Sequence, residues 1–174
     1  MFIGIDCRTI GEPAGVGEYT RKLVKHLLQI DGHNRYALFF NADFSGAKDY
    51  EKANAKIVFL PSRKLKKFLP IVYSHFLVAN AINREKPDVC LFPANAMPLG
   101  YRGKTVLTVH DLAVYKMPEL FPDKLIDLDR WLIVPLSVRR ADKIIAISES
   151  TKKDIMEIFK MSGQKIKVIY EGAG

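Results

Sequence analysis

The sequence contains no long hydrophobic run and very little cysteine. A membrane-spanning helix needs about 20 consecutive apolar residues, and no stretch of the chain approaches that length. The N-terminus has neither the basic region nor the apolar segment of a cleaved signal peptide. Cys7 and Cys90 lie in or beside apolar runs without CxxC spacing. They therefore predict buried thiols in a reducing cytoplasm, not a disulfide framework.

Two common nucleotide-binding motifs are also missing or incomplete. No G-x-x-x-x-G-K-[ST] segment occurs, which excludes a Walker-type phosphate loop. Gly15 and Gly17 begin a G-x-G-x-x-G pattern, but Thr20 stands where the third glycine belongs. The strand expected at 35–41 does not end on the acidic residue that would bind a ribose. These departures argue against NAD binding.

The composition is that of a globular domain with a basic surface. The chain has 174 residues, of which 48% are hydrophobic, and this is enough for one domain with a sizeable core. Its net charge of +8 comes from 27 Lys and Arg against 19 Asp and Glu. Such a surface favours phosphorylated ligands, polyanions or anionic membranes, or is simply solvated, and composition does not choose between these. No groove-reading motif accompanies the charge, so nucleic-acid binding is not predicted.

Short apolar runs alternate with helical patterns along the whole chain. Strands are expected at 2–6, 35–41, 57–60, 88–92, 104–109, 144–147 and 166–169. Helices are expected at 17–28, 70–85, 121–140 and 148–160, the third of them disturbed by Pro135. This alternation predicts parallel βαβ units, and so a Rossmann-like, doubly wound, mainly parallel α/β sheet.

The segment between the first strand and the first helix is a candidate phosphate site. Gly15, Val16 and Gly17 stand where a helix begins, and helix N-termini present unpaired N–H groups to anions. The alternative is that the glycines only form a sharp loop. The residues alone leave both interpretations open.

His110 and Asp111 follow the strand expected at 104–109. They therefore lie at the carboxyl edge of the sheet, where open α/β sheets bind ligands. His110 could donate a hydrogen bond to a substrate oxygen or transfer a proton near neutral pH. The alternative is a surface histidine beside an aspartate that caps a turn.

Ser148 and Thr151 follow the next strand at the same edge. Ser148 is a plausible N-cap, and Glu149 suits the positive end of the helix dipole. Capping is therefore the favoured role of this segment. The alternative is that the hydroxyl groups also line a ligand cleft.

Two further patterns concern metals and membranes. Asp127 and Asp129 match the D-x-D of metal-binding sugar transferases, but positions i and i+2 of a helix point to different sides, so the match is interpreted as chance. The four histidines lack metal-ligand spacing, and no metal is predicted.

Between residues 63 and 69, four cations are mixed with apolar residues, a pattern typical either of a segment that binds anionic lipid or of a solvated loop. The cations are Arg63, Lys64, Lys66 and Lys67.

Five segments in order, GIDCRT, GVGEYTRKLVKHL, TVHDLA, RRADKIIAISESTKKD and VIYEG, resemble the N-terminal half of retaining glycosyltransferases of family 4, which have the GT-B fold. The resemblance implies two Rossmann-like domains facing each other across a cleft, the first binding mainly the acceptor and the second mainly the donor. Residues 1–170 would be the N-terminal domain and 171–174 the start of the linker. The C-terminal donor-binding domain is expected to lie outside this chain.

The resemblance also implies roles for single residues. Gly15, Val16 and Gly17 would approach the donor diphosphate, and His110, with Asp111 beside it, would lie near the reacting centre. The hydroxyl groups of Ser148 and Thr151 would lie at the cleft edge as part of the donor site. No metal or other cofactor is implied.

The implied full-length enzyme transfers a sugar from a nucleoside-diphosphate sugar to a hydroxyl group of a glycan, polysaccharide or lipid-linked acceptor, with retention. Its expected location is the cytoplasm, peripherally on the inner face of the membrane. The isolated domain is expected to be inactive. The alternatives are a noncatalytic partner or binding module and a GT-B protein similar to nucleotide-sugar epimerases.

Overall fold

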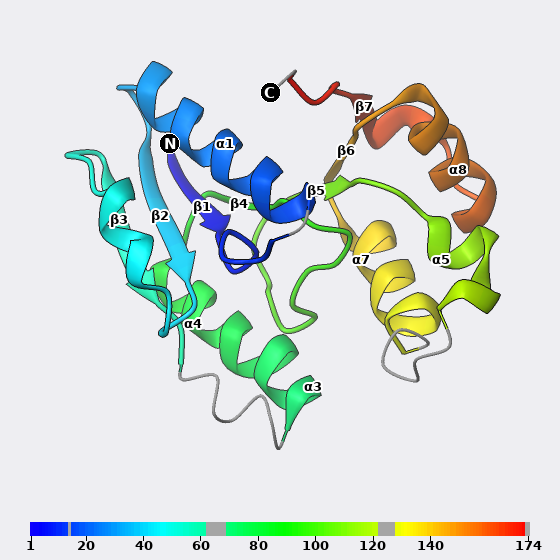
Figure 1. The fold of residues 1–174 in the computed structure, drawn as a ribbon, viewed down its shortest axis with the longest axis horizontal. Helices are drawn as coiled ribbons and strands as arrows, with labels where there is room; N and C mark the ends of the chain where they lie inside the picture. The colour runs from blue at the N-terminus through cyan, green and yellow to red at the C-terminus, as the bar shows by residue number, and fades with distance from the viewer. Residues whose placement is uncertain (14, 62–68, 122–127, 173–174) are drawn as a thin grey trace.

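The computed structural model describes residues 1–13, 15–61, 69–121 and 128–172, and within them seven strands form one sheet (Figure 1). The order is β3-β2-β1-β4-β5-β6-β7, and every neighbouring pair is parallel. The strands are β1 (Phe2–Asp6), β2 (Arg35–Phe40), β3 (Ala55–Phe59), β4 (Val89–Phe92), β5 (Thr105–Val109), β6 (Lys143–Ala146) and β7 (Ile166–Val168). The predicted Rossmann-like, doubly wound sheet is confirmed.

The strand order reverses direction between β1 and β4. The chain moves outward from β1 through β2 to β3 and then returns to the other side of β1 to add β4. In open α/β sheets, ligands bind outside the carboxyl ends of the strands at such a switch point. The topology therefore marks the ends of β1 and β4 as a place to look for a site.

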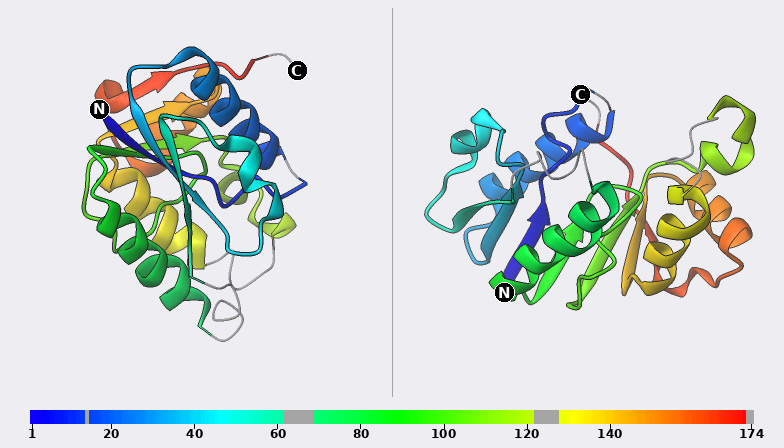
Figure 2. Two further views of the ribbon diagram at one scale, coloured as in Figure 1. Left: turned by 90° about the vertical axis from the view of Figure 1, so that its left-hand side faces the viewer. Right: turned by 90° about the horizontal axis from the view of Figure 1, so that it is seen from below.

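Helices cover both faces of the sheet. The main ones are α1 (Gly15–Ile30), α4 (Val78–Glu85), α7 (Val134–Arg140) and α8 (Glu149–Phe159). In Figure 2, α1 lies on one face, and α4 and α7 lie side by side on the other. Short pieces that the sequence pattern did not predict include η1 (Ser45–Tyr50), α5 (Ala113–Lys116), η3 (Pro118–Leu120) and η5 (Gly163–Lys165).

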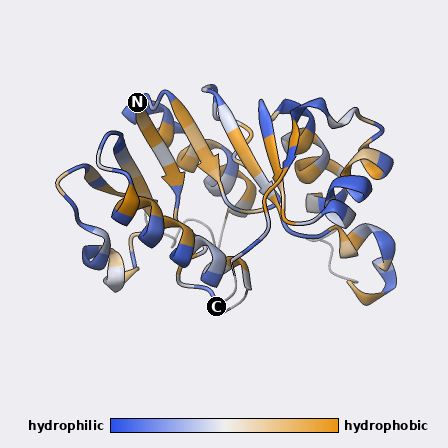
Figure 3. Ribbon diagram, turned by 90° about the horizontal axis from the view of Figure 1, so that it is seen from above, coloured by the Kyte–Doolittle hydropathy of each residue, from blue (hydrophilic) through white to orange (hydrophobic). Residues whose placement is uncertain are grey.

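The core has one part on each face because β2 is buried on both sides. Leu38 and Phe40 pack with Val24 of α1, whereas Phe39, which points the opposite way, packs with Ile82 of α4. A strand covered on both faces is hydrophobic along its length instead of alternating. The hydrophobic colouring of the central strands in Figure 3 shows this arrangement.

Two helical segments contain a wider π turn. The helix expected at 70–85 runs as α3 (Pro70–Val72), the π turn η2 (Tyr73–Leu77) and α4. In the segment around Pro135, the π turn η4 (Asp129–Ile133) directly precedes α7. Proline lacks an N–H group and crowds the carbonyl of the preceding turn, and widening that turn relieves both problems. The predicted disturbance at Pro135 is confirmed in this form.

None of the helices in the described part of the chain is both long enough and apolar enough to span a bilayer.

Candidate functional site

Three predicted segments meet at the carboxyl edge of the sheet: the start of α1, the end of β5 and the start of α8. The Tyr19 ring of α1 lies edge-on to the His110 ring after β5, with 4.8 Å between centroids. The Thr151 hydroxyl of α8 donates a hydrogen bond to the His110 carbonyl at 3.0 Å. Residues separated by up to 132 positions in the sequence are therefore held around one histidine.

The two glycines lie in the first turn of α1, not in a loop, and they differ in their surroundings. A Cβ atom on Gly17 would lie 2.2 Å from the Glu12 carbonyl oxygen and 2.6 Å from that of Thr9. Glycine is therefore required at position 17, because the loop after β1 lies directly against the helix. A Cβ atom on Gly15 would meet nothing within 4 Å. The packing explains Gly17, and contact of this turn with a phosphate stays a prediction.

Gly15 opens onto a groove that lies between α1 and the segment after β7. The groove has a volume of about 490 Å³, and Tyr19, Lys22 and Glu171 also line it. The backbone N–H groups of the first helical turn have no partner within the helix and carry its partial positive charge. This groove is the place where an anionic group could reach the start of α1.

The His110 side chain is buried and held at both ring nitrogens. It is 7% exposed, its Nε2 atom lies 3.0 Å from the Pro93 carbonyl oxygen, and its Nδ1 atom lies 3.0 Å from a carboxylate oxygen of Glu171. A carbonyl oxygen only accepts hydrogen bonds, so the contact with Pro93 is a hydrogen bond donated by the Nε2–H group. His110 is therefore not a surface histidine, and its ring is oriented from two sides.

Tyr19 completes this cluster around His110. Its hydroxyl group lies 3.4 Å from that of Thr108, a buried residue of β5. Burial raises the pKa of Tyr19, the hydrogen bond with Thr108 opposes that change, and the charge of Glu171 adds to it. Tyr19 therefore stays a neutral hydroxyl group at physiological pH. Sequence reasoning treated Tyr19 only as an apolar helix position, and its contact with His110 follows from the tertiary structure.

Asp111 has a local structural role in the described structure. Its carboxylate accepts a hydrogen bond from the Ala113 N–H at 3.0 Å, at the start of α5. Its backbone carbonyl accepts from Nδ2 of Asn95 at 3.0 Å, and Oδ1 of the same Asn95 side chain accepts from the His110 N–H at 2.9 Å. The alternative that Asp111 caps a turn is confirmed, and its place beside the reaction stays a prediction.

Ser148 caps α8 as expected. Its hydroxyl oxygen accepts a hydrogen bond from the Thr151 N–H at 3.0 Å, and the two hydroxyl oxygens lie 3.0 Å apart. Thr151 in turn bonds to the His110 carbonyl. The predicted capping is confirmed, and the cap also connects α8 to the end of β5. Contact of these hydroxyl groups with a donor stays a prediction.

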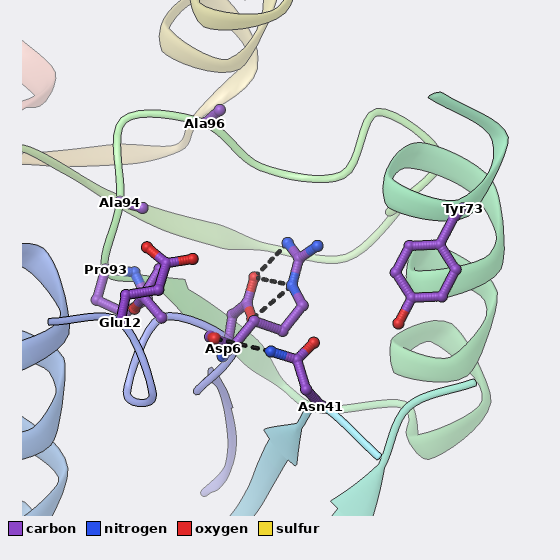
Figure 4. A pocket seen from close by; sticks show the side chains of 9 residues that line it. Asp6, Glu12, Asn41, Tyr73, Pro93, Ala94 and Ala96 are labelled. Atoms are coloured by element: carbon purple, nitrogen blue, oxygen red, sulfur yellow. Dashed lines mark hydrogen bonds and ion pairs between the residues drawn. The ribbon is translucent and has the colours of Figure 1, made fainter. Parts of the chain in front are cut away.

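A cavity of about 170 Å³ lies at the switch point, and sequence reasoning did not identify it. Figure 4 shows Glu12 beside Pro93 on one side, Tyr73 on the opposite side, and Asp6 and Asn41 between them. Ala94 and Ala96, which follow β4, form another wall (Figure 4). The remaining lining residues are Arg8 and Thr9. The signal that could have found it is the GIDCRT segment, because it places two opposite charges directly at a strand end.

A buried ion pair forms the floor of this cavity. Asp6 is 7% exposed, and the Arg8 guanidinium donates to it from Nε at 2.9 Å and from Nη2 at 2.7 Å. Burial acts to lower the pKa of Arg8, but the adjacent Asp6 carboxylate outweighs it and the pKa is raised. Arg8 therefore stays charged and paired with Asp6. Such two-point pairing holds both side chains in one geometry.

Pro93 connects the cavity with the histidine cluster. It lines the cavity, and its carbonyl oxygen contacts the Nε2 atom of His110. The two parts of the carboxyl edge are therefore separated by one residue. A ligand in the cavity would lie beside the loop that orients His110.

Comparison with known proteins identifies the family. The sequence model of the family Glycosyltransferase Family 4 matches residues 13–173. The chain belongs to this family. No curated protein sequence matches the family 4 domain significantly.

Solved structures show the same fold for this family 4 domain. The lipopolysaccharide outer core galactosyltransferase WaaB in its apo form has a TM-score of 0.56 at 16% identity, covering 98% of this chain and 45% of that one. Anabaena HepE in complex with UDP and glucose has a TM-score of 0.61 at 19% identity, covering 99% and 45%. Arabidopsis thaliana UGT89C1 complexed with UDP has a TM-score of 0.53 at 9% identity, covering 97% and 48%. The family 4 domain thus spans less than half the length of each, and the fold is that of a GT-B glycosyltransferase domain.

Two predicted features of the family 4 domain lie outside the described residues. They are the basic residues Arg63, Lys64, Lys66 and Lys67, and Asp127 of the D-x-D pattern. Within the described residues, no group of three His, Cys, Asp or Glu side chains is arranged to bind a metal ion.

Proposed function

We propose that the chain is the acceptor-side, N-terminal domain of a retaining glycosyltransferase. The full-length enzyme transfers a sugar from a nucleoside-diphosphate sugar to an acceptor hydroxyl group. The observation that carries the proposal is the cluster in which the start of α1, His110 and the capped start of α8 meet at the carboxyl edge of a family 4 domain. Two helix N-termini at one edge provide a positive potential for a diphosphate.

Each predicted residue has a place in this proposal. The N–H groups of Gly15, Val16 and Gly17 stabilise the leaving diphosphate from one side of the groove. His110 donates from Nδ1 to an oxygen of the transferred sugar near the reacting centre, where that oxygen replaces the Glu171 carboxylate, and Asp111 holds the following turn. Ser148 and Thr151 maintain the opposite side of the donor site. Preorganised donors of this kind stabilise developing negative charge without a metal ion.

A second domain supplies most of the donor contacts in this proposal. Residues 1–170 form the acceptor-side domain and 171–174 begin the linker. The solved structures with the same fold are more than twice as long as the part that this chain covers, which supports a two-domain enzyme. HepE was solved with UDP and glucose and UGT89C1 with UDP, which supports a uridine nucleotide as a first donor to test.

The proposal places the enzyme in the cytoplasm, against the inner face of the membrane, where lipid-linked acceptors are accessible. The basic segment at 63–67 supports this location, because cations near anionic lipid contribute about 1 kcal/mol each. Directly after it, Leu69, Ile71 and Phe76 expose large apolar side chains. Neutralising Arg63, Lys64, Lys66 and Lys67 should reduce co-sedimentation with anionic vesicles. Unchanged co-sedimentation would favour the alternative interpretation, in which the segment is a solvated loop.

The decisive experiment screens the full-length protein with radiolabelled nucleoside-diphosphate sugars and a panel of acceptors. We expect label transfer from one sugar class and a product whose anomeric configuration matches that of the donor. The 174-residue chain alone should be inactive. Specific binding to a glycan or protein without any turnover would instead support a noncatalytic binding module. Interconversion of sugar epimers on the nucleotide would support the epimerase-like alternative.

A further inference from the structure

The backbone leaves the sheet directly after β5, at His110 and Asp111. The ladder between β4 and β5 ends at Phe92 and Leu107, so both residues lie beyond it. Backbone N–H and carbonyl groups that no longer have a strand beside them need other hydrogen-bond partners. The side chains that supply those partners therefore decide where the backbone of His110 stands.

The Asn95 side chain supplies two of these partners at once. Its Oδ1 atom accepts a hydrogen bond from the His110 N–H at 2.9 Å, and its Nδ2 atom donates to the Asp111 carbonyl at 3.0 Å. A carboxamide carries an acceptor and a donor on separate atoms of one planar group, which matches this pair of backbone groups. Asn95 thus bridges two consecutive residues at the end of β5.

The same short segment also holds the His110 ring. The carbonyl oxygen of Pro93, two residues before Asn95, accepts a hydrogen bond from Nε2 of His110 at 3.0 Å. One segment is therefore attached to both the backbone and the ring of the histidine. Together the two attachments fix the rotation of the ring, so that Nδ1 is the nitrogen that faces Glu171.

The contacts of Asn95 favour a structural task over contact with a substrate. Both polar atoms of its side chain are already bonded to the backbone. Pro93, Ala94 and Ala96 line the switch-point cavity, whereas Asn95 is not one of its lining residues. Asn95 is therefore turned toward the histidine and not toward the space that a ligand could fill.

We infer that Asn95 is a positioning residue, which holds the 93–95 segment against the end of β5 so that the His110 ring keeps one orientation. The residue acts through His110 and touches no reacting atom. The expected effect on turnover rests on the proposed function, because there Nδ1 of His110 donates to the transferred sugar. The expected effect on the ring itself does not depend on that function.

Asn83 of α4 is a matched control within the same protein. Its Nδ2 atom donates to the Gly100 carbonyl at 3.0 Å, and its Oδ1 atom accepts from the Arg102 N–H at 3.2 Å. It therefore makes the same two kinds of bond with a loop backbone. That loop precedes β5, whereas His110 follows it, and a strand of five residues at about 3.3 Å each lies between them.

The first test compares the kinetics of Asn95→Ala and Asn83→Ala in the full-length protein. Each variant loses two bonds to the backbone, so both should lower the midpoint of thermal unfolding by similar amounts. Asn95→Ala should in addition lower kcat at least tenfold, because a displacement of about 1 Å near the chemistry can cost about 100-fold. The KM for the nucleotide sugar should stay within twofold. Asn83→Ala should leave both constants within twofold.

A second variant keeps the test informative if Asn95→Ala does not fold. Asn95→Asp has nearly the same shape and keeps an acceptor for the His110 N–H, but it places an oxygen against the Asp111 carbonyl. Two acceptors cannot bond to each other, so one of the two attachments is lost. We expect kcat to fall at least threefold, and unchanged kcat would overturn the inference.

The second test observes the ring directly by ¹⁵N NMR of the full-length protein labelled at histidine. His110→Ala identifies the signals of His110. Exchange of its Nε2 proton with water should be at least tenfold faster in Asn95→Ala and Asn95→Asp than in the unaltered protein, because the Pro93 carbonyl is no longer held in place. Asn83→Ala should leave that exchange rate unchanged.

The two tests separate this inference from the proposed function. The inference is overturned if Asn95→Ala leaves either kcat or the exchange rate unchanged, or if Asn83→Ala lowers kcat as much. Absence of turnover with every nucleotide sugar would overturn the transferase proposal alone. The exchange rate of the Nε2 proton would then still decide whether Asn95 positions His110.

Discussion

The two halves of the carboxyl edge are built in opposite ways. Around His110, several weak contacts act together: Tyr19 touches the ring, Pro93 and Glu171 lie at its two nitrogens, and Thr151 donates to its carbonyl. Around the switch-point cavity, one strong pair, Asp6 with Arg8, forms the floor and a volume of about 170 Å³ stays open. The difference indicates that the first half holds a side chain in position, whereas the second half holds space for a ligand. Four further experiments test this contrast, from the largest expected effect to the smallest.

Arg8→Met should destabilise the domain by about 3 kcal/mol. It leaves the buried Asp6 carboxylate without its partner, and removing one member of a buried pair typically costs about 3–5 kcal/mol. A loss of stability at the upper end of this range is not expected, because the Arg8 side chain is 23% exposed. Urea unfolding measures the change. Adding Asp6→Asn to Arg8→Met should recover part of the loss, and no recovery would show that the pair does not act as a unit.

His110→Ala in the full-length enzyme should lower kcat by about 100-fold or more, because losing one preorganised hydrogen-bond donor at the reacting centre costs about 10²–10³ in kcat. The KM for the nucleotide sugar should change much less, since in the proposed function the backbone at Gly15–Gly17 and a second domain hold the nucleotide. Steady-state kinetics measures both constants, and thermal unfolding checks that the variant is folded. Unchanged kinetics would make His110 a bystander.

Gly17→Ala should destabilise the domain by about 1–3 kcal/mol, because its methyl group overlaps two backbone oxygens that cannot rotate away. Gly15→Ala is the matched control in the same helical turn. The added methyl group meets nothing within 4 Å, so the stability of the Gly15→Ala domain should be unchanged or raised by up to about 1 kcal/mol. Urea unfolding of both variants compares them. Equal effects would contradict the close approach of the 9–12 loop to α1.

Ser148→Ala should cost about 1 kcal/mol of stability, the usual effect of removing an N-cap side chain. Ser148→Asp keeps an acceptor at the same position and should retain most of that stability. Chemical unfolding of the two variants separates the lost cap from the lost hydroxyl group. If both lose stability equally, the hydroxyl contact with Thr151 matters more than the cap.

Local patterns predicted the elements of this fold well. The runs at 2–6, 104–109 and 144–147 became β1, β5 and β6 with shifts of at most one residue. Ser148 capped α8 as its residue type and position suggested. These predictions succeeded because strand hydrophobicity and capping depend on neighbours within a few residues. The start of α1 at Gly15 instead of Gly17 shows the usual weakness of boundaries.

The parts of the site that the patterns missed depend on long-range packing. Tyr19 and Glu171 lie 91 and 61 positions from His110, and only the folded sheet brings them to its ring. The cavity combines Asp6, the last residue of β1, with Asn41 and Pro93, which directly follow β2 and β4. These three strands are separated in the sequence but lie side by side in the sheet. No local signal identified Glu12 as part of its lining.

The sequence by itself determined the parallel α/β class, the two helix N-termini and the resemblance to glycosyltransferases, a class that the family match also gives. These properties follow from the local periodicity of apolar residues and from short motifs in a fixed order. Only the tertiary structure decided that Gly17 is required by a loop packed against it, that His110 is held from both sides, and that the strand-order reversal leaves a cavity beside it. Those properties depend on which strands become neighbours, and the pairing of strands distant in sequence is decided by the assembly of the whole core.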